Sequence, residues 1–237
     1  MDAVFQGIVQ GLTEFLPVSS SGHLELFSLL FGFRGDLSFV AFLHLGTFIA
    51  VLIFSFKKLL YVFEKPMIMA MLIISTIPAV VFGLIFEEMI EKSFNPKVLP
   101  VTFSITAAFL LLGSVMDGKK KMEEMHWVDA LLIGFAQVLA LVPGISRSGM
   151  TIAAALILGY DLEDSLYYSF LMALPVTLGA GLLKFQGAGT PGLVGLTFSF
   201  LFGLLALFLL RKSVYSCKLH YFGYYLIGVS LISFFMG

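Results

Sequence analysis

The chain is short of charge and of cysteine, and each shortage excludes a class of protein. Only 12% of its 237 residues are Asp, Glu, Lys or Arg, about half the share in an ordinary soluble domain. Fourteen basic residues stand against fifteen acidic ones, so no basic surface is available for a nucleic-acid partner. The single cysteine, Cys217, excludes an intrachain disulfide and a cysteine-based metal site.

Apolar residues take the place of the missing charge. They make up 59% of the chain, and the mean hydropathy is +1.01, which indicates a multi-pass protein surrounded by membrane lipid. Six apolar runs approach the roughly 20 residues that a helix needs to cross a bilayer. Two further regions are broken midway by Pro, Ser and Gly into halves too short to span. We expect re-entrant helical hairpins there, with tilted or kinked full spans as the alternative. The runs cover 38–56, 66–86, 98–116, 165–184, 192–210 and 220–236, and the broken regions cover 2–32 and 127–160.

The two broken regions resemble each other in sequence. "GIVQGLTEFLPVSSSGH" (7–23) aligns with "GFAQVLALVPGISRSGM" (134–150) at one constant offset. Each copy would consist of one hairpin and three spans, and because three is odd, the second copy would be inserted upside down. Such inverted repeats bring two broken elements together near the bilayer midplane. The aligned identities include Gly7/Gly134, Gln10/Gln137, Ser19/Ser146, Ser21/Ser148 and Gly22/Gly149.

These patterns predict one fold class. We expect an all-α integral membrane protein with six transmembrane helices plus two re-entrant helical hairpins in an inverted repeat. It would form a single membrane domain over 1–237, with repeat one at 1–116 and repeat two at 127–237. Nine lysines and arginines fall on the face opposite the N-terminus and four on its own face. By the positive-inside rule, both termini and the mouth of the first hairpin then face the extracytoplasmic side.

The polar residues concentrate at the two hairpin tips. Non-helical backbone at membrane depth must be buried by protein or line a wet cavity, so we expect the tips to meet in a polar pocket. The N-terminus of the helix after each tip favours an anion. Gly22 and Gly149 would allow close approach of a ligand, and Arg147 adds a planar cation suited to phosphate. Hydroxyl donors would come from Ser19, Ser20, Ser21, Ser146, Ser148 and Thr151.

Two ionisable residues of the first hairpin are candidates for chemistry. Glu14 shares a helix face with Gln10, and such a carboxylate suits a ligand or metal role, with a structural pair to Arg147 as the alternative. His23 follows the serines and suits acid–base or nucleophilic work, although a histidine on an apolar helix is often a satisfied core residue. His44 lies inside a span, where we expect only a helix–helix hydrogen bond.

Two of these segments also resemble known motifs. "EFLPVSSSGHL" (14–24) and "PGISRSGMT" (143–151) resemble the two signature motifs of the bacterial undecaprenyl-diphosphate phosphatases, the bacitracin-resistance family. The resemblance implies a hydrolase of the bacterial cytoplasmic membrane that removes the terminal phosphate of undecaprenyl diphosphate and so recycles the lipid carrier for cell-wall synthesis. It also implies a site reached from the extracytoplasmic side and stimulation by a divalent cation, Mg²⁺ or Ca²⁺.

The family's functional residues fall on defined positions of this chain. The resemblance implies catalytic roles for Glu14, Ser20, His23 and Arg147, with Glu14 also as the metal ligand. Gln10 occupies a place that a second Glu often holds, which weakens a two-carboxylate metal site. The phosphate-binding residues would be Gln10, Ser19, Ser21, Gly22, Ser146, Ser148, Gly149 and Thr151.

Several alternatives stay open at the level of sequence. The "SSGH" and "SR" segments also echo the type-2 phosphatidic acid phosphatases, but the segment 146–159 lacks the histidine that acts as nucleophile there. The nucleophile can be Ser20, His23 or water. A lipid-carrier flippase or secondary transporter would need the same anion pocket without a nucleophile. The oligomeric state, including a homodimer, is left open.

Overall fold

A computed structural model describes residues 2–32, 37–92, 95–183, 189–215 and 219–236. These residues are almost entirely helical, and the one β-type pairing among them is an isolated bridge between Lys120 and Tyr160. The helices are α1 (Asp2–Phe15), α2 (Ser20–Phe31), α3 (Leu37–Phe63), α4 (Pro66–Ile85), α5 (Glu87–Lys92), α6 (Leu99–Ser114), α7 (Trp127–Leu139), α8 (Arg147–Ile157), α9 (Leu162–Leu183), α10 (Gly189–Tyr215) and α11 (His220–Met236), with short 3₁₀ turns at Pro96–Val98 and Met122–Glu124.

Five segments of the described chain are long and apolar enough to cross a membrane. Together with the helical content, they make this an all-α, multi-pass membrane protein. The last predicted span forms α11, which has 17 residues and is shorter than the roughly 20 that a perpendicular crossing needs. The five segments are Ser38–Phe63, Pro66–Ile85, Pro96–Ser114, Leu162–Leu182 and Pro191–Lys212.

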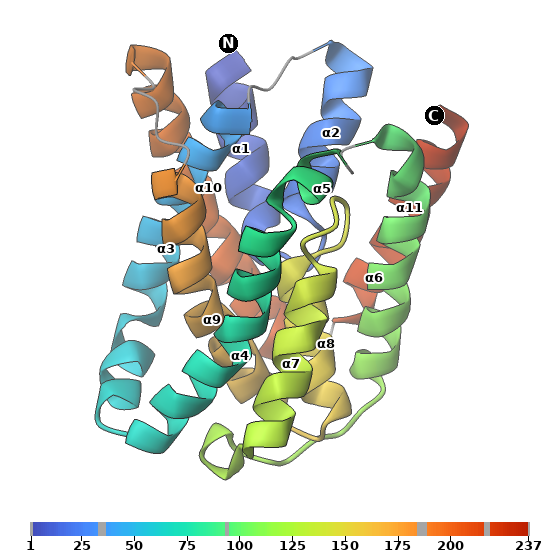
Figure 1. The fold of residues 1–237 in the computed structure, drawn as a ribbon. Coiled ribbons are helices and arrows are strands. Elements are labelled where there is room, and N and C mark those ends of the chain that lie inside the picture. The colour runs from blue at the N-terminus through green and yellow to red at the C-terminus, as the bar shows by residue number, and fades with distance from the viewer. Residues whose placement is uncertain (1, 33–36, 93–94, 184–188, 216–218, 237) are drawn as a thin grey trace.

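The two broken regions form two pairs of short helices. Helices α1 and α2 have 14 and 12 residues, and α7 and α8 have 13 and 11, each below the length of a span. In Figure 1, α1 and α2 open toward the end of the bundle that holds the N-terminus, and α7 and α8 open toward the opposite end. Most residues of both connecting loops are buried, although Val142 of the second is exposed.

Each loop ends in the same helix cap. The Ser19 Oγ accepts a hydrogen bond from the Gly22 amide at 3.3 Å, and the Ser146 Oγ accepts one from the Gly149 amide at 3.1 Å. A serine at this position satisfies an amide that would otherwise lack a partner in the first turn. The matched serines and glycines of the two sequence copies therefore have the same local role.

Each hairpin packs against a helix from the other half of the chain. Helix α1 packs on α10, and α7 packs on α4. Glycines make both contacts close: a Cβ added at Gly7 would lie 2.4 Å from the Gly195 carbonyl oxygen, and one added at Gly134 would lie 2.6 Å from that of Ser75. No larger residue fits either position without movement of the backbone.

The segment that joins the two halves of the chain, between α6 and α7, is bound by polar contacts at the end of the bundle away from the N-terminus. Lys58 donates to Asp164 at 3.1 Å, and Lys121 pairs with Asp161. Tyr61 donates to Glu123 at 2.5 Å, and this hydrogen bond holds the pKa of the Glu123 carboxyl below its usual range. These contacts tie the linker to the ends of α3 and α9.

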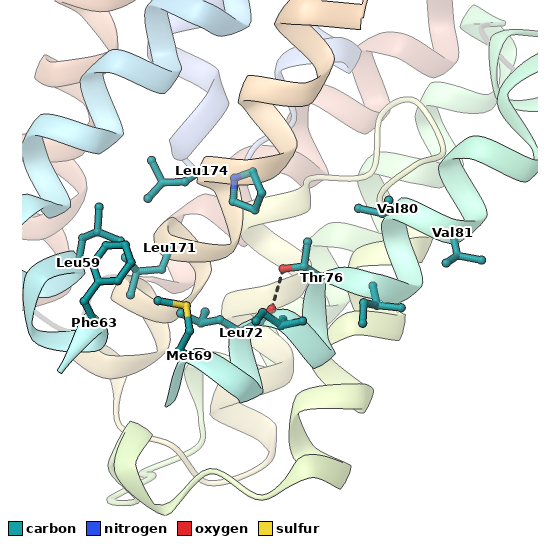
Figure 2. A pocket seen from close by; sticks show the side chains of 12 residues that line it. Leu59, Phe63, Met69, Leu72, Thr76, Val80, Val81, Leu171 and Leu174 are labelled. Atoms are coloured by element: carbon teal, nitrogen blue, oxygen red, sulfur yellow. Dashed lines mark hydrogen bonds between the residues drawn. The ribbon is translucent and has the colours of Figure 1, made fainter. Parts of the chain in front are cut away.

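An apolar groove of about 380 Å³ lies between the end of α3, α4 and α9. Figure 2 shows its lining, in which Leu59, Met69 and Leu171 are typical members. Thr76 is the one polar side chain among the described lining residues, and its hydroxyl donates to the Leu72 carbonyl at 2.7 Å. The groove therefore presents only hydrocarbon, and the polar chemistry of the protein lies elsewhere.

Candidate functional site

The tips of the two hairpins lie against each other. The Ser148 hydroxyl donates to the Leu16 carbonyl at 3.1 Å, and the Gly144 amide lies 3.5 Å from the Ser21 Oγ. A Cβ added at Gly22 would come within 2.9 Å of the Gly144 Cα. Residues more than 120 positions apart in sequence are thus brought into one polar region.

Glu14 is the centre of this region. Its Oε2 accepts hydrogen bonds from the Gln10 amide at 2.9 Å and the Ser20 hydroxyl at 2.7 Å. Its Oε1 accepts one from Arg147 Nη2 at 2.6 Å. The Nε2 of His44 lies 3.6 Å from Oε2. A carboxylate that is only 6% exposed is costly unless it is paired, and Arg147 of the second hairpin supplies the opposite charge.

Some polar atoms around Glu14 have no partner within the described residues. These are the Oε1 of Gln10 and the Nη1 of Arg147, both buried. Buried polar atoms are almost always paired in folded proteins, so each unpaired one needs an explanation. Nη1 is an unpaired donor on the same guanidinium whose Nη2 binds Glu14, and a phosphate oxygen is the kind of group that it binds.

His23 makes its contacts away from Ser20. Its Nδ1 lies 2.8 Å from the Ser19 carbonyl oxygen, and its Nε2 lies 2.7 Å from the Tyr225 hydroxyl. Ser19 has φ +73°, the one positive φ of a non-glycine residue among those described. Ser20 instead donates its hydroxyl to Glu14. In this conformation Glu14, and not His23, is placed to accept the Ser20 proton.

The hydroxyls of the second tip bind protein atoms. The Ser146 amide donates to Thr106 Oγ1 at 3.1 Å, and Ser148 bonds to Leu16 as described above. Thr151 donates to the Arg147 carbonyl at 2.9 Å and shares a hydrogen bond of 2.7 Å with Ser169. These bonds fix the first turn of α8 and hence the origin of the Arg147 side chain.

The two tip glycines approach protein side chains. A Cβ added at Gly22 would lie 2.7 Å from the Phe103 ring, and one added at Gly149 would lie 2.9 Å from Thr106 Cγ2. Both neighbours belong to α6. Helix α6 therefore packs closely on both glycines, and their predicted approach to a ligand stays a prediction.

The sequence matches a family model described as "Bacitracin resistance protein BacA" over residues 3–232. The chain belongs to the BacA family. Full-length relatives named undecaprenyl-diphosphatase include those of Thermotoga maritima, 47% identical over 98% of each chain, and Thermosipho africanus, 44% identical over 100% of each chain. A third, from Methanococcus maripaludis, is 44% identical over 100% of this chain and 98% of the relative.

Two site residues of this BacA family member were not found from its sequence. His44 was expected only to join helices, yet it faces Glu14. Tyr225 was not considered, yet it contacts His23 across 202 positions. Neither residue lies in a motif. The spacing of residues along one helix also does not reveal which other helix a given side chain faces. The motifs that carried the BacA resemblance lie at the tips and include neither residue.

Proposed function

We propose that this protein hydrolyses undecaprenyl diphosphate to undecaprenyl phosphate and inorganic phosphate, and thereby recycles the lipid carrier for cell-wall synthesis and confers bacitracin resistance. The full-length relatives named undecaprenyl-diphosphatase support this activity. The observation that carries it is the cluster of Glu14, Ser20 and Arg147, which joins a charged base, a hydroxyl and a guanidinium across the two tips.

The reaction begins at the Ser20 hydroxyl. The diphosphate lies with oxygens of its terminal phosphate on the free Nη1 of Arg147, which stabilises charge as it develops. Ser20 Oγ attacks the terminal phosphorus while its proton passes to Glu14 Oε2. The bond from that phosphorus to the bridging oxygen breaks, and undecaprenyl phosphate leaves. The 2.7 Å hydrogen bond from Ser20 to Glu14 supports this order.

The phosphorylated serine is then hydrolysed. His23 Nε2 accepts a proton from the attacking water, and inorganic phosphate leaves as the Ser20 oxygen regains the proton held by Glu14. His23 then releases its proton to the departing phosphate or to solvent, which restores the resting state. This role requires an unprotonated Nε2, which the bond from Nδ1 to the Ser19 carbonyl supports. Direct attack by water or by His23 on the substrate are the alternatives, and a phosphoserine trapped by acid quench separates Ser20 from both.

A divalent cation, Mg²⁺ or Ca²⁺, belongs to the same proposal. Oxygen ligands suit both ions, and Glu14 with the unpaired Gln10 Oε1 would hold the cation. Within the described part of the chain, no three His, Cys, Asp or Glu side chains gather into a metal cluster. The substrate phosphates and water would therefore supply most ligands, as Mg²⁺ commonly prefers. When bound, the cation neutralises charge on the diphosphate.

The proposed architecture has six spans and two re-entrant hairpins in an inverted repeat, with α11 as a short sixth span. The equivalent serine caps and the equivalent glycine contacts of α1 and α7 support the repeat. The lysine and arginine asymmetry supports extracytoplasmic termini and active site. After replacement of Cys217, an impermeant thiol reagent should label a cysteine placed at Asn95 in sealed cells but not one at Lys119. The reverse pattern contradicts this orientation.

The activity is tested directly by phosphate release from undecaprenyl diphosphate. The purified wild-type protein should release phosphate, and a chelator should slow it. Glu14→Gln removes the base, whereas Glu25→Gln changes a partly exposed carboxylate of α2 outside the cluster and serves as the matched control. Absence of release with any divalent cation would contradict hydrolysis and favour translocation of the lipid carrier.

A further inference from the structure

A tyrosine from the last helix holds the His23 ring. The Tyr225 hydroxyl lies 2.7 Å from His23 Nε2, and the two rings stack with centroids 5.7 Å apart and an interplanar angle of 7°. His23 is only 2% exposed, whereas Tyr225 is 49% exposed. A half-exposed residue of α11 therefore reaches into the buried site and touches the nitrogen that the reaction needs.

The partners of the ring determine which nitrogen carries the proton. A backbone carbonyl can only accept a hydrogen bond, so the 2.8 Å contact to the Ser19 oxygen places a hydrogen on Nδ1. In the neutral imidazole, Nε2 then carries the lone pair. The Tyr225 O–H is consequently the donor and Nε2 the acceptor.

Two further features restrict the ring. The Phe103 ring meets the imidazole edge-on, with centroids 5.5 Å apart. Ser19, whose carbonyl binds Nδ1, has a strained backbone with φ +73°. Strain at one residue persists only when its surroundings impose it, and it is found most often at functional sites. Ser19, Phe103 and Tyr225 thus hold the imidazole from three different segments.

We propose that Tyr225 is a positioning residue for His23. Its ring and hydroxyl keep the imidazole in one orientation with Nε2 unprotonated, ready to accept a proton from the water that completes hydrolysis. Because the Nε2 lone pair accepts one hydrogen bond, the Tyr225 hydroxyl gives way to this water when the reaction proceeds. The inference rests on the proposed phosphatase activity, and it adds a residue of α11 that lies outside both tip motifs.

The decisive variant is Tyr225→Phe, which removes one oxygen and keeps the stacked ring. We expect kcat to fall about tenfold, as when one hydrogen bond is lost from an active group, and KM to stay within about twofold. Tyr224→Phe is the matched control, because Tyr224 is 58% exposed on the same helix and its ring meets His220 edge-on instead of contacting His23. It should retain wild-type kcat.

A double-mutant cycle separates this role from a general structural one. If Tyr225 acts through His23, Tyr225→Phe should have no further effect in a His23→Gln background. The same loss in both backgrounds, or full activity of Tyr225→Phe alone, would overturn the proposal. Equal losses from Tyr224→Phe and Tyr225→Phe would overturn it as well.

A spectroscopic measurement tests the contact without reference to activity. In protein with ¹⁵N-labelled histidine, the His23 signals are identified by their disappearance in His23→Gln. We expect an unprotonated, hydrogen-bonded Nε2 in the wild type and a free, unprotonated Nε2 in Tyr225→Phe. A protonated Nε2 in the wild type, or signals that Tyr225→Phe leaves unchanged, would refute the contact. If the wild type releases no phosphate, the proposed function fails, and this spectrum still decides the assignment of Tyr225.

Discussion

The two hairpin tips share their scaffold and differ in their chemistry. Positions that match between the copies carry structure: Ser19 and Ser146 cap the following helices. The carboxylate, the nucleophilic hydroxyl, the imidazole and the guanidinium stand at positions that differ. Where the first tip has Glu14, Ser20 and His23, the same offset gives Leu141, Arg147 and Met150 in the second.

This difference shows how one duplicated element can serve two purposes. The first tip presents the carboxylate, the hydroxyl and the imidazole. The second presents one cation, Arg147, from a helix whose hydroxyls and serine cap are bonded to protein atoms. A base needs a counter-charge that keeps it buried and ionised, and only the other copy supplies it. The site is therefore incomplete in either copy alone.

The largest expected effect comes from removing the Glu14 carboxylate, which the second tip lacks at its matching position, Leu141. Glu14→Gln keeps the shape but removes the charge and the proton acceptor for Ser20. We expect kcat to fall about 10³-fold, the scale of a general base, and stimulation by Mg²⁺ to be lost. Phosphate release measured over a range of Mg²⁺ concentrations tests this. Wild-type turnover would make Glu14 purely structural.

The next effect comes from the cation of the second tip. Arg147→Lys keeps the charge but loses the planar fork that binds Glu14 and leaves Nη1 for phosphate. We expect kcat to fall about 10²-fold, as on removal of one preorganised donor. The double variant Arg147→Lys, Ser20→Ala should lose less activation free energy than the sum of the two single losses, because both residues serve one phosphate. Full additivity would mean that the tips act on separate groups.

A smaller effect, on stability, is expected where each hairpin packs on the other half. Gly7→Ala and Gly134→Ala place a methyl group against a carbonyl oxygen of α10 or α4. We expect each to lower the free energy of unfolding by about 1–3 kcal/mol, the usual cost of overpacking. Thermal unfolding in detergent measures it, with Gly228→Ala as control because a Cβ there meets no atom within 4 Å. A loss of stability in only one of the two variants would mean that the two hairpins do not pack equivalently.

The smallest effect is expected at the helix caps. Ser19→Ala and Ser146→Ala each remove a side-chain acceptor from a first-turn amide. We expect each to cost about 1 kcal/mol of stability, as for other serine caps. The same unfolding measurement applies. Because the Ser146 bond is the shorter of the two, a cost at Ser19 that exceeds the cost at Ser146 would point to a second role for the Ser19 side chain.

The sequence predicted the elements that local chemistry determines. Proline, serine and glycine interrupt α1–α2 and α7–α8 where expected, because those residues end helices and cap the next ones. The predicted ends of long helices were less accurate: the run 38–56 forms a helix that continues to Phe63. Helical hydrogen bonds do not stop at the end of an apolar stretch, so hydropathy alone does not give the last residue.

The partners of the site residues could be predicted only in part. Glu14 was left between a metal ligand and a pair with Arg147, and the two are bonded, which leaves the metal role a proposal. His23 was expected to do acid–base or nucleophilic work, which stays a prediction, and the contacts of its ring with Ser19 and Tyr225 could not be read from the sequence. Such contacts depend on the rotation and register of helices from distant segments. The residue periodicity of a single helix does not predict such contacts.

The packing of α1 on α10 has a consequence for how the protein is made. Helix α10 begins at Gly189, so the ribosome must add more than 150 residues after α2 before α1 meets its main partner. At about 5–20 residues per second, this delay lasts roughly 10–40 s. During that time the first hairpin, with its buried carboxylate and serines, has no completed bundle around it. The polar residues of the first hairpin therefore have to be accommodated before the penultimate helix arrives.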